Sequence, residues 1–323
     1  MEISLLQFIK TRGVGVKTIE RFCSFIRQHK IYLEALKGRH DVLFLKDQVG
    51  VKGNLAEAIV AKYDEARRER ERLIENHIRM LWLGSDSYPT KLEDVLGSDA
   101  PPYLFVKGNI DVLNSDCVGV CGSRHASQRG IELAKDIAIK LANNGIGIVS
   151  GNATGVDIVS HESTLQNGGA TVFVLPLGIL NYRARPEIEA LLSTKNHLIV
   201  SQFPPETMWF AHNAMARNSV IVAISNAMLV VEAGLSGGSL AAGEKAIELG
   251  NPLFAMKYSI PPESALGNDI LIRKGAMPIS QGDNGGLDLG PLIKRARQRM
   301  VRKSHIVQPS LFSSDAHPLL YHP

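Results

Sequence analysis

The sequence has little of what marks secreted, membrane-spanning or strongly basic proteins. Its 323 residues include three cysteines and 6% aromatic residues, and the formal net charge is only +4. So few cysteines, without metal-ligand spacing, predict neither a disulfide framework nor a zinc site. No apolar run is long enough to span a bilayer and no signal pattern stands at the N-terminus, so we expect a cytoplasmic protein without a membrane partner.

The middle of the chain lacks a catalytic constellation and carries repeated glycine turns instead. Residues 116–256 alternate strand, turn and helix patterns, and the turns contain CGSR, SGNATGVD, LPLG and GLSGGSL. Near-continuous apolar runs such as TVFVLP and AMLVVEA indicate strands that are buried on both faces. The pattern predicts an α/β fold with a Rossmann-like, doubly wound and mostly parallel sheet.

The turn after the first of these strands favours an anion. Gly122 lets backbone approach a ligand, the following helix start attracts negative charge, and Arg124 can hold phosphate with two donors. The alternative is an ordinary turn with a solvated arginine. GVCGSRHASQRG lacks the Gly-x-Gly-x-x-Gly order and no acid follows the second strand, so we expect no dinucleotide and no other cofactor.

The second turn indicates helix capping rather than a metal site. Asn152 and Asp157 suit the start of a helix, where their side chains satisfy free N–H groups, and His161 lies one turn further on. Because no third ligand has suitable spacing, Asp157 and His161 predict no metal.

Several ordered motifs resemble the DNA-processing protein A family (DprA, also called Smf). These are CGSRHAS, SGNATGVDIVSH, LPLGILNY, ARNSVI, VVEAGLSGGSL and GNDILIRKGA, and the match runs roughly from Met80 to Ile279. The resemblance implies a non-enzymatic protein that binds single-stranded DNA. It further implies protection of incoming DNA and loading of the RecA recombinase in natural transformation, with a homodimer as the working form.

The resemblance also implies a nucleic-acid-binding site in the loops that follow the strands. The matching residues are Gly122, Ser123, Arg124, Asn152, Gly155, Asp157, His161, Arg217, Asn218, Gly237, Gly238, Ser239, Gly267 and Asn268. Five positions depart from the family pattern, and two of them, Lys257 and Tyr258, replace an expected Pro-Gly. Ser219 stands where a second arginine is usual, Gln202 where a glutamate is common, and Ala242 where a threonine is expected.

The chain divides into three segments by pattern. We expect a small all-α domain over residues 1–78, the Rossmann-like domain over 79–285, and a basic helix with a disordered tail over 286–323. GVGVKT in the first segment resembles a helix-hairpin-helix motif, in which Lys17 would contact nucleic acid. Such hairpins also serve as packing units alone.

The C-terminal segment offers two further contact candidates. KRARQRMVRK at 294–303 holds six basic residues and no acid, which favours either nucleic-acid attraction or a solvated helix. Gln308, Leu311 and Phe312 resemble the short peptide that binds the replicative sliding clamp, although such short matches also arise by chance.

Two other classes of function remain open in the sequence. Gly237, Gly238 and Glu244 match part of a motif of nucleotide phosphoribohydrolases from the same superfamily, and Glu232 is a second carboxylate at a strand end. The other alternative is an adaptor in phage defence or a mobile element that has lost tight DNA binding, which the arginine missing at Ser219 would explain.

Overall fold

A computed structural model describes residues 1–282 and 286–298 of the chain. Within these ranges nine strands form one sheet in the order β1-β2-β6-β5-β4-β3-β7-β8-β9. β1 and β2 are antiparallel to their neighbours, and the remaining pairs are parallel, as a doubly wound fold predicts. The strands are β1 (Arg79–Trp82), β2 (Tyr103–Gly108), β3 (Cys117–Cys121), β4 (Gly147–Ser150), β5 (Thr171–Val174), β6 (His197–Ser201), β7 (Ala227–Val230), β8 (Leu253–Met256) and β9 (Met277–Ile279).

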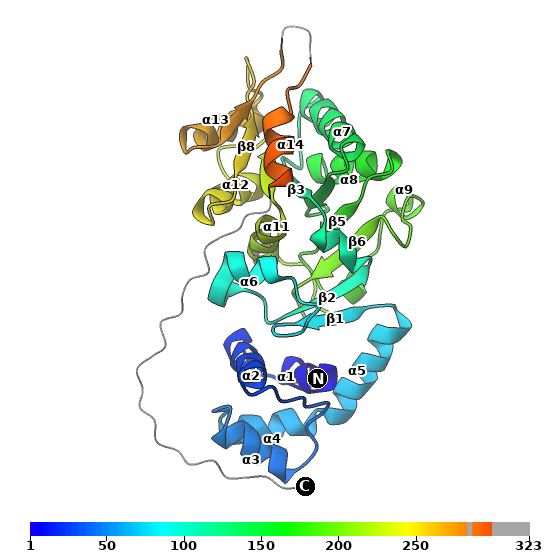
Figure 1. Cartoon of the computed structure of the whole chain (residues 1–323), viewed down its shortest axis with the longest axis vertical. Helices are drawn as coiled ribbons and strands as arrows, with labels where there is room; N and C mark the ends of the chain where they lie inside the picture. The colour runs from blue at the N-terminus through cyan, green and yellow to red at the C-terminus, as the bar shows by residue number, and fades with distance from the viewer. Residues whose placement is uncertain (283–285, 299–323) are drawn as a thin grey trace.

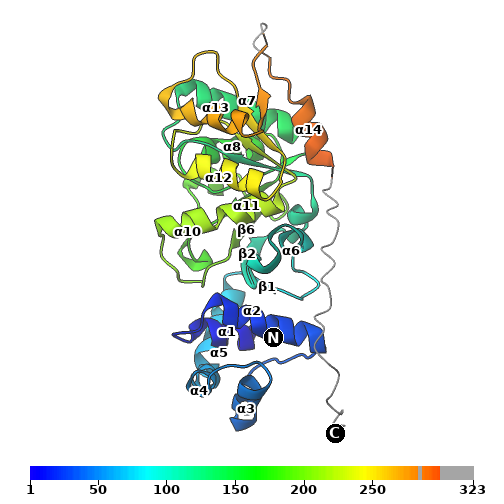
Figure 2. The ribbon, with the colours of Figure 1, turned by 90° about the vertical axis from the view of Figure 1, so that its left-hand side faces the viewer.

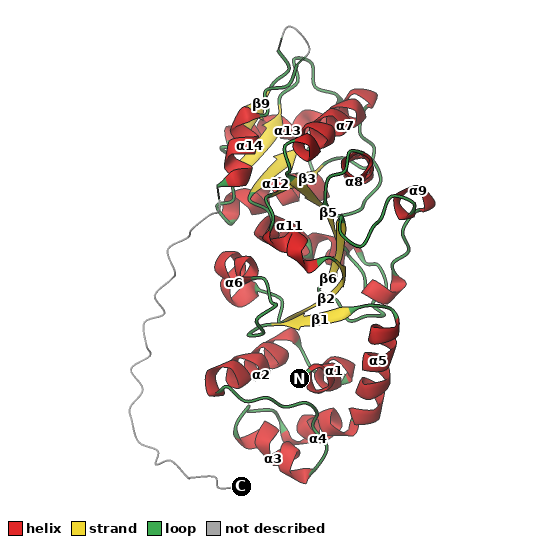
Figure 3. Cartoon of the chain, turned by 45° about the vertical axis from the view of Figure 1, so that its right-hand side comes forward, coloured by secondary structure: helices red, strands yellow, loops and turns green. Residues whose placement is uncertain are grey.

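Helices cover both faces of the sheet, so its central strands are buried on both sides (Figure 3). Alternate residues of β3 enter different cores: Val118 and Val120 pack on one face, and Cys117 and Cys121 on the other. The first face carries α7 (Gln128–Asn143), α8 (Val156–Gln166) and α14 (Gly290–Arg297). The second carries α6 (Thr90–Leu96), α11 (Asn218–Ile224), α12 (Gly238–Glu248) and α13 (Leu266–Arg273).

The strand order reverses between β3 and β7. From β3 the chain builds outward through β4, β5 and β6, and it then returns to add β7 and β8 on the other side. Loops at such a reversal diverge to opposite faces of the sheet and leave a crevice at the carboxyl ends of the strands. This crevice is where a ligand of an open α/β sheet is expected.

Five helices precede the sheet and pack beneath its antiparallel edge (Figure 1). They are α1 (Glu2–Lys10), α2 (Val16–His29), α3 (Arg39–Asp47), α4 (Gly53–Ala61) and α5 (Tyr63–Glu75). Phe8 and Phe22 join the same apolar cluster as Phe105 and Phe173 of the sheet. The helical segment and the sheet therefore share a continuous core, although their sequence patterns change near residue 78.

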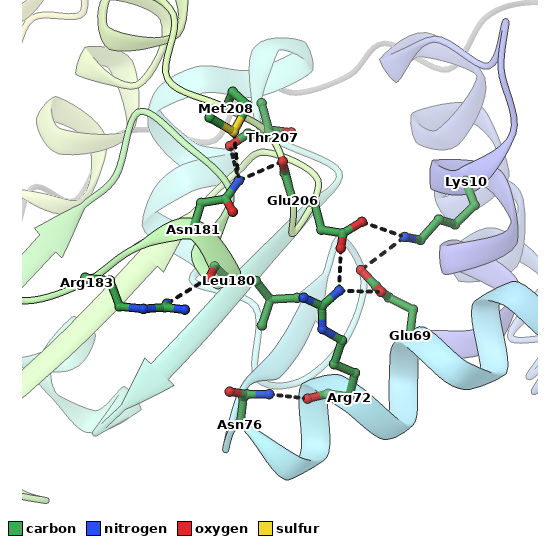
Figure 4. Close-up of polar contacts among 10 residues, drawn as sticks. All are labelled: Lys10, Glu69, Arg72, Asn76, Leu180, Asn181, Arg183, Glu206, Thr207 and Met208. Atoms are coloured by element: carbon green, nitrogen blue, oxygen red, sulfur yellow. Dashed lines mark hydrogen bonds and ion pairs between the residues drawn. The ribbon is translucent and has the colours of Figure 1, made fainter.

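A group of four alternating charges ties these helices to the loop after β6 (Figure 4). Lys10 lies 3.2 Å from Glu69 and 3.6 Å from Glu206, and Arg72 pairs with Glu206. Arg72 and Lys10 lower the pKa of the Glu206 carboxyl. The Asn181 amide also donates to the Glu206 backbone carbonyl at 2.7 Å, so this loop is held from both sides.

The spacing of apolar residues in the sequence predicts helices over 55–78, 185–196 and 216–225, and the structure differs from each of these ranges. The long helix expected up to residue 78 breaks at Lys62, because α4 packs with α3 whereas α5 lies along α1. The helix predicted over 185–196 is only α9 (Pro186–Glu189), since the Asn196 side chain bonds the Ser193 N–H and the Leu191 carbonyl in place of a further turn. The helix predicted over 216–225 is α11, which begins at Asn218, and a separate short helix, α10 (Ala211–Ala216), precedes it.

Two simpler expectations concern membranes and cysteines. In the described part of the chain, no helix is both long and apolar enough to cross a bilayer. All three cysteines are buried free thiols, and no group of potential metal ligands occurs among the described residues.

Candidate nucleic-acid interface

A pocket of about 470 Å³ opens in the crevice between β3 and β7. Its walls come from the loops after β3, β4 and β7 and from α10, which Figure 2 shows beside α11 and α12. Most of the predicted turn residues meet here: Gly122, Ser123, Arg124, Asp157, Arg217, Asn218, Gly238 and Ser239 all line the pocket. Segments that are up to 117 positions apart in sequence, from Gly122 to Ser239, thus form one cavity.

Arg217 places a buried cation in the wall of this pocket. Its side chain is 6% exposed, it donates to the Gly151 carbonyl at 3.2 Å, and its Nε has no hydrogen-bond partner among the described residues. No described carboxylate lies within 4.0 Å of its nitrogens, although Asp157 is close enough to oppose the lowering of the Arg217 pKa that burial causes. A desolvated guanidinium without a paired anion favours binding of an anion from outside.

Two of the helix starts around the pocket already hold a carboxylate of this chain. At α8, Asp157 accepts from the N–H groups of Gly151 at 3.2 Å and Ala153 at 3.3 Å. Before α7, Glu232 accepts from the Ser127 N–H at 2.8 Å and from its hydroxyl at 2.5 Å. These donors are therefore not free for a phosphate, which the glycine pattern alone did not reveal.

The third helix start, at α12, is open. Gly237 has a φ of +105° and caps the helix without a side-chain hydrogen bond, so the N–H groups of the first turn face the pocket without a partner inside the helix. A Cβ added to Gly238 would meet no atom within 4 Å. The protein itself has no steric need for glycine at position 238, whereas a ligand seated on these N–H groups would require it.

Other predicted glycines have packing causes within the chain. A Cβ at Gly122 would come within 2.5 Å of the Val156 side chain, and one at Gly155 within 2.3 Å of the Ser123 carbonyl. A Cβ at Gly267 would lie 2.2 Å from the Gly234 carbonyl. These residues shape the loops around the pocket through close backbone packing.

Several predicted site residues lie in the core or away from the pocket. His161 is fully buried, donates to or accepts from Thr171 at 2.6 Å and stacks on Phe173. Asn268 bonds the Ala233 N–H and two backbone carbonyls, all at 2.8 Å, and so braces the end of β7. Asn152, in the left-handed conformation at φ +60°, belongs to the loop before α8 but does not line the pocket.

Lys17 lies in the helical segment, where its ammonium donates to the Ser98 carbonyl at 3.2 Å and pairs with Glu20 at 3.1 Å. Its side chain nevertheless remains 73% exposed. The structure thus puts it on α2, beneath the antiparallel edge of the sheet, and not beside the pocket (Figure 1).

The low aromatic content of the sequence did not indicate the aromatic wall that Trp209 and Phe210 form. Trp209 lines the pocket with its ring 5.9 Å from the Arg124 guanidinium carbon, and Phe210 beside it is 51% exposed. The adjacent Trp209 and Phe210, which shortly precede the ARNSVI motif in the sequence, were the signal that could have found this surface.

The two carboxylates considered for nucleotide hydrolysis, Glu244 and Glu232, already bind other groups of this protein. Glu244 lies on α12 and pairs with Lys274 at 2.5 Å, and it does not line the pocket. Glu232 is fully buried and holds loop hydrogen bonds. The geometry gives no positioned acid and base at the pocket among the described residues.

Known proteins resemble the chain over the same sheet. The family model for DNA recombination-mediator protein A matches residues 79–285. The DNA processing protein DprA of Streptococcus pneumoniae is 34% identical over 201 residues, which cover 62% of this chain and 70% of that protein. The Smf protein of Escherichia coli is 34% identical over 199 residues, which cover 61% of this chain but only 53% of that protein.

Solved structures agree with this. The X-ray structure of DprA from Streptococcus pneumoniae superposes with a TM-score of 0.72 at 26% identity, covering 86% of this chain and 94% of that one. A Helicobacter pylori structure described as showing a single-stranded DNA binding mode of DNA processing protein A gives a TM-score of 0.53 at 26% identity, covering 62% and 90%. These relatives are named as DNA-processing proteins, and the chain belongs to the DNA recombination-mediator protein A family.

Proposed function

We propose that this protein binds single-stranded DNA at the pocket between β3 and β7. A backbone phosphate is held by the N–H groups at the start of α12 and by the guanidinium of Arg217, and Arg124 at the rim neutralises a neighbouring phosphate. The observation that carries this proposal is that the buried Arg217, whose Nε has no hydrogen-bond partner among the described residues, lines the same pocket as the open start of α12.

Preference for a single strand follows from the aromatic wall. Trp209 lines the pocket beside the phosphate-binding donors and is 48% exposed, and Phe210, the next residue in the chain, is 51% exposed. Bases can stack on such rings only when they are unpaired, whereas a duplex hides its base faces. The Helicobacter pylori relative, which is described with a single-stranded DNA binding mode, supports the same choice of ligand.

The wider role is part of the proposal. By family resemblance, the protein protects single-stranded DNA and loads RecA in recombination or natural transformation, as a cytoplasmic homodimer. The sliding-clamp contact through Gln308, Leu311 and Phe312 falls outside the described residues.

Fluorescence anisotropy of labelled single- and double-stranded oligonucleotides over a salt series tests the proposal. Each neutralised phosphate on a single strand contributes about −0.7 to the slope of log affinity against log salt. Arg124→Ala should make the slope shallower by about that amount and weaken binding about tenfold.

Arg67→Ala is the matched control, because Arg67 is an exposed arginine of α5 that pairs with Glu71 away from the pocket. It should leave affinity and slope unchanged. Equal affinity and slope for Arg124→Ala and the wild type would show that the strand binds elsewhere.

A further inference from the structure

A second groove of about 530 Å³ continues the pocket along the same edge of the sheet. Four residues line both cavities: Ser123, Gly234, Ser236 and Ser264. The groove lies between the loops that follow β3, β7 and β8. The two cavities are therefore neighbours, and a DNA strand that leaves the pocket on this side passes these shared residues to reach the groove.

The chemistry of the groove differs from that of the pocket. Leu235 is 63% exposed and Leu266 is 36% exposed, and His125 is exposed beside them. Among the residues that the structure describes, no arginine or lysine lines this groove, and Glu263 is its one carboxylate. Apolar side chains with a nearby negative charge disfavour a phosphate, whereas a base and its sugar suit them.

A buried carboxylate joins two of the loops around the groove by hydrogen bonds. The buried Glu232 carboxylate accepts hydrogen bonds from Ser127, which ends the loop after β3, and from the Ser264 hydroxyl at 2.7 Å, in the loop after β8. Gly130 makes room for it, since a Cβ there would lie 2.4 Å from the carboxylate. Glu232 is thus a positioning residue that holds the loops after β3 and β8 in place before any ligand binds.

We propose that this groove is a second subsite, which takes the base and sugar of a nucleotide next to the one whose phosphate binds at the start of α12. The inference rests on the proposed function and extends it. The two cavities together account for an alternation of phosphate and base contacts along one strand, with Trp209 in the wall of the pocket.

The test compares two oligonucleotides of equal length and charge, an oligothymidylate and the same backbone with every base removed. Fluorescence anisotropy measures the affinity of both oligonucleotides for three proteins. These are the wild type, a Leu235→Ala, Leu266→Ala double variant, and Leu43→Ala. Leu43 is an exposed leucine of α3, so its truncation controls for loss of surface apolar area.

The double variant should bind the oligothymidylate at least about fivefold more weakly than the wild type, because base contacts in the groove are lost. Its affinity for the abasic strand should match that of the wild type, and Leu43→Ala should change neither. Equal oligothymidylate affinity for the double variant and the wild type overturns the subsite. An equal loss on both strands also overturns it, since the effect would then not involve a base. If the wild type binds neither strand at low salt, the proposed function itself fails.

Discussion

Replacing Gly238 by alanine should move stability and DNA affinity in opposite directions. Gly238 begins α12, has no positive φ, and leaves open space where a Cβ would stand. Alanine fits this backbone without strain and restricts the unfolded chain, so the free energy of unfolding should rise by about 0.4 to 1 kcal/mol. For a domain of this size, that is an increase in Tm of about 1 to 3 °C.

The same methyl group would occupy the approach of a phosphate to the helix start. Hydrogen bonds to a charged group contribute about 1.5 to 3 kcal/mol each, so losing one should weaken binding about 10- to 100-fold. Gly38→Ala is the control, since Gly38 also starts a helix and has open space at its Cβ, but lies in the helical segment. It should keep full affinity.

Thermal unfolding and anisotropy on the same preparations measure both quantities. A Gly238→Ala protein that is at least as stable as the wild type and binds single-stranded DNA equally well would refute the assignment of the α12 start as a phosphate site. A loss of both stability and affinity would refute the claim that the space at Gly238 is open.

Three other changes have defined outcomes. Glu232→Gln should lower the free energy of unfolding by about 1 to 3 kcal/mol and weaken DNA binding, because hydrogen bonds to the buried carboxylate from the loops after β3 and β8 are lost. Glu244→Gln, which breaks only an exposed ion pair, should change neither stability nor DNA binding. Equal stability of the two variants in denaturant titrations would contradict the positioning role of Glu232. Burial lowers the pKa of His161 to about 3. Below about pH 6.5 this imidazole therefore binds a proton in the unfolded chain but stays neutral in the folded protein. Unfolding free energy should therefore fall as the pH drops from about 6.5 toward 3, and less steeply in His161→Phe; parallel pH profiles would contradict this. Glu206→Gln should cost at most about 1 kcal/mol and less at high salt, since Glu206 and Arg72 are about half exposed; a larger, salt-independent loss would show that solvent does not screen this contact.

The sheet could be predicted because its signals are local. Buried parallel strands produce apolar runs such as TVFV, and glycine turns with helical periodicity separate them, so strand, turn and helix follow one another visibly. The edge strands β1 and β2 were not assigned individually, because pairing of Arg79 with Val106 across an intervening helix is not encoded in either segment alone.

The sequence predicted which loops form the site, but not which of their helix starts are free to bind a ligand. The family resemblance implies one site that includes Gly122, Asp157 and Gly238 in the loops after the strands, but it does not distinguish the helix starts of these loops from one another. Which helix starts are free depends on side chains that come from distant strands, such as Glu232 after β7 reaching Ser127 before α7. Burial of Arg217 against Gly151 likewise arises only when the sheet is assembled.

The central claim is that a phosphate of single-stranded DNA binds between Arg217 and the start of α12. A crystal structure of the full chain with a short oligothymidylate measures this directly. The account predicts a phosphate within hydrogen-bond distance of the Gly238 or Ser239 N–H and of the Arg217 guanidinium, with a base beside Leu235. A strand bound on the helical segment near Lys17, with the pocket between β3 and β7 free of phosphate, would contradict it.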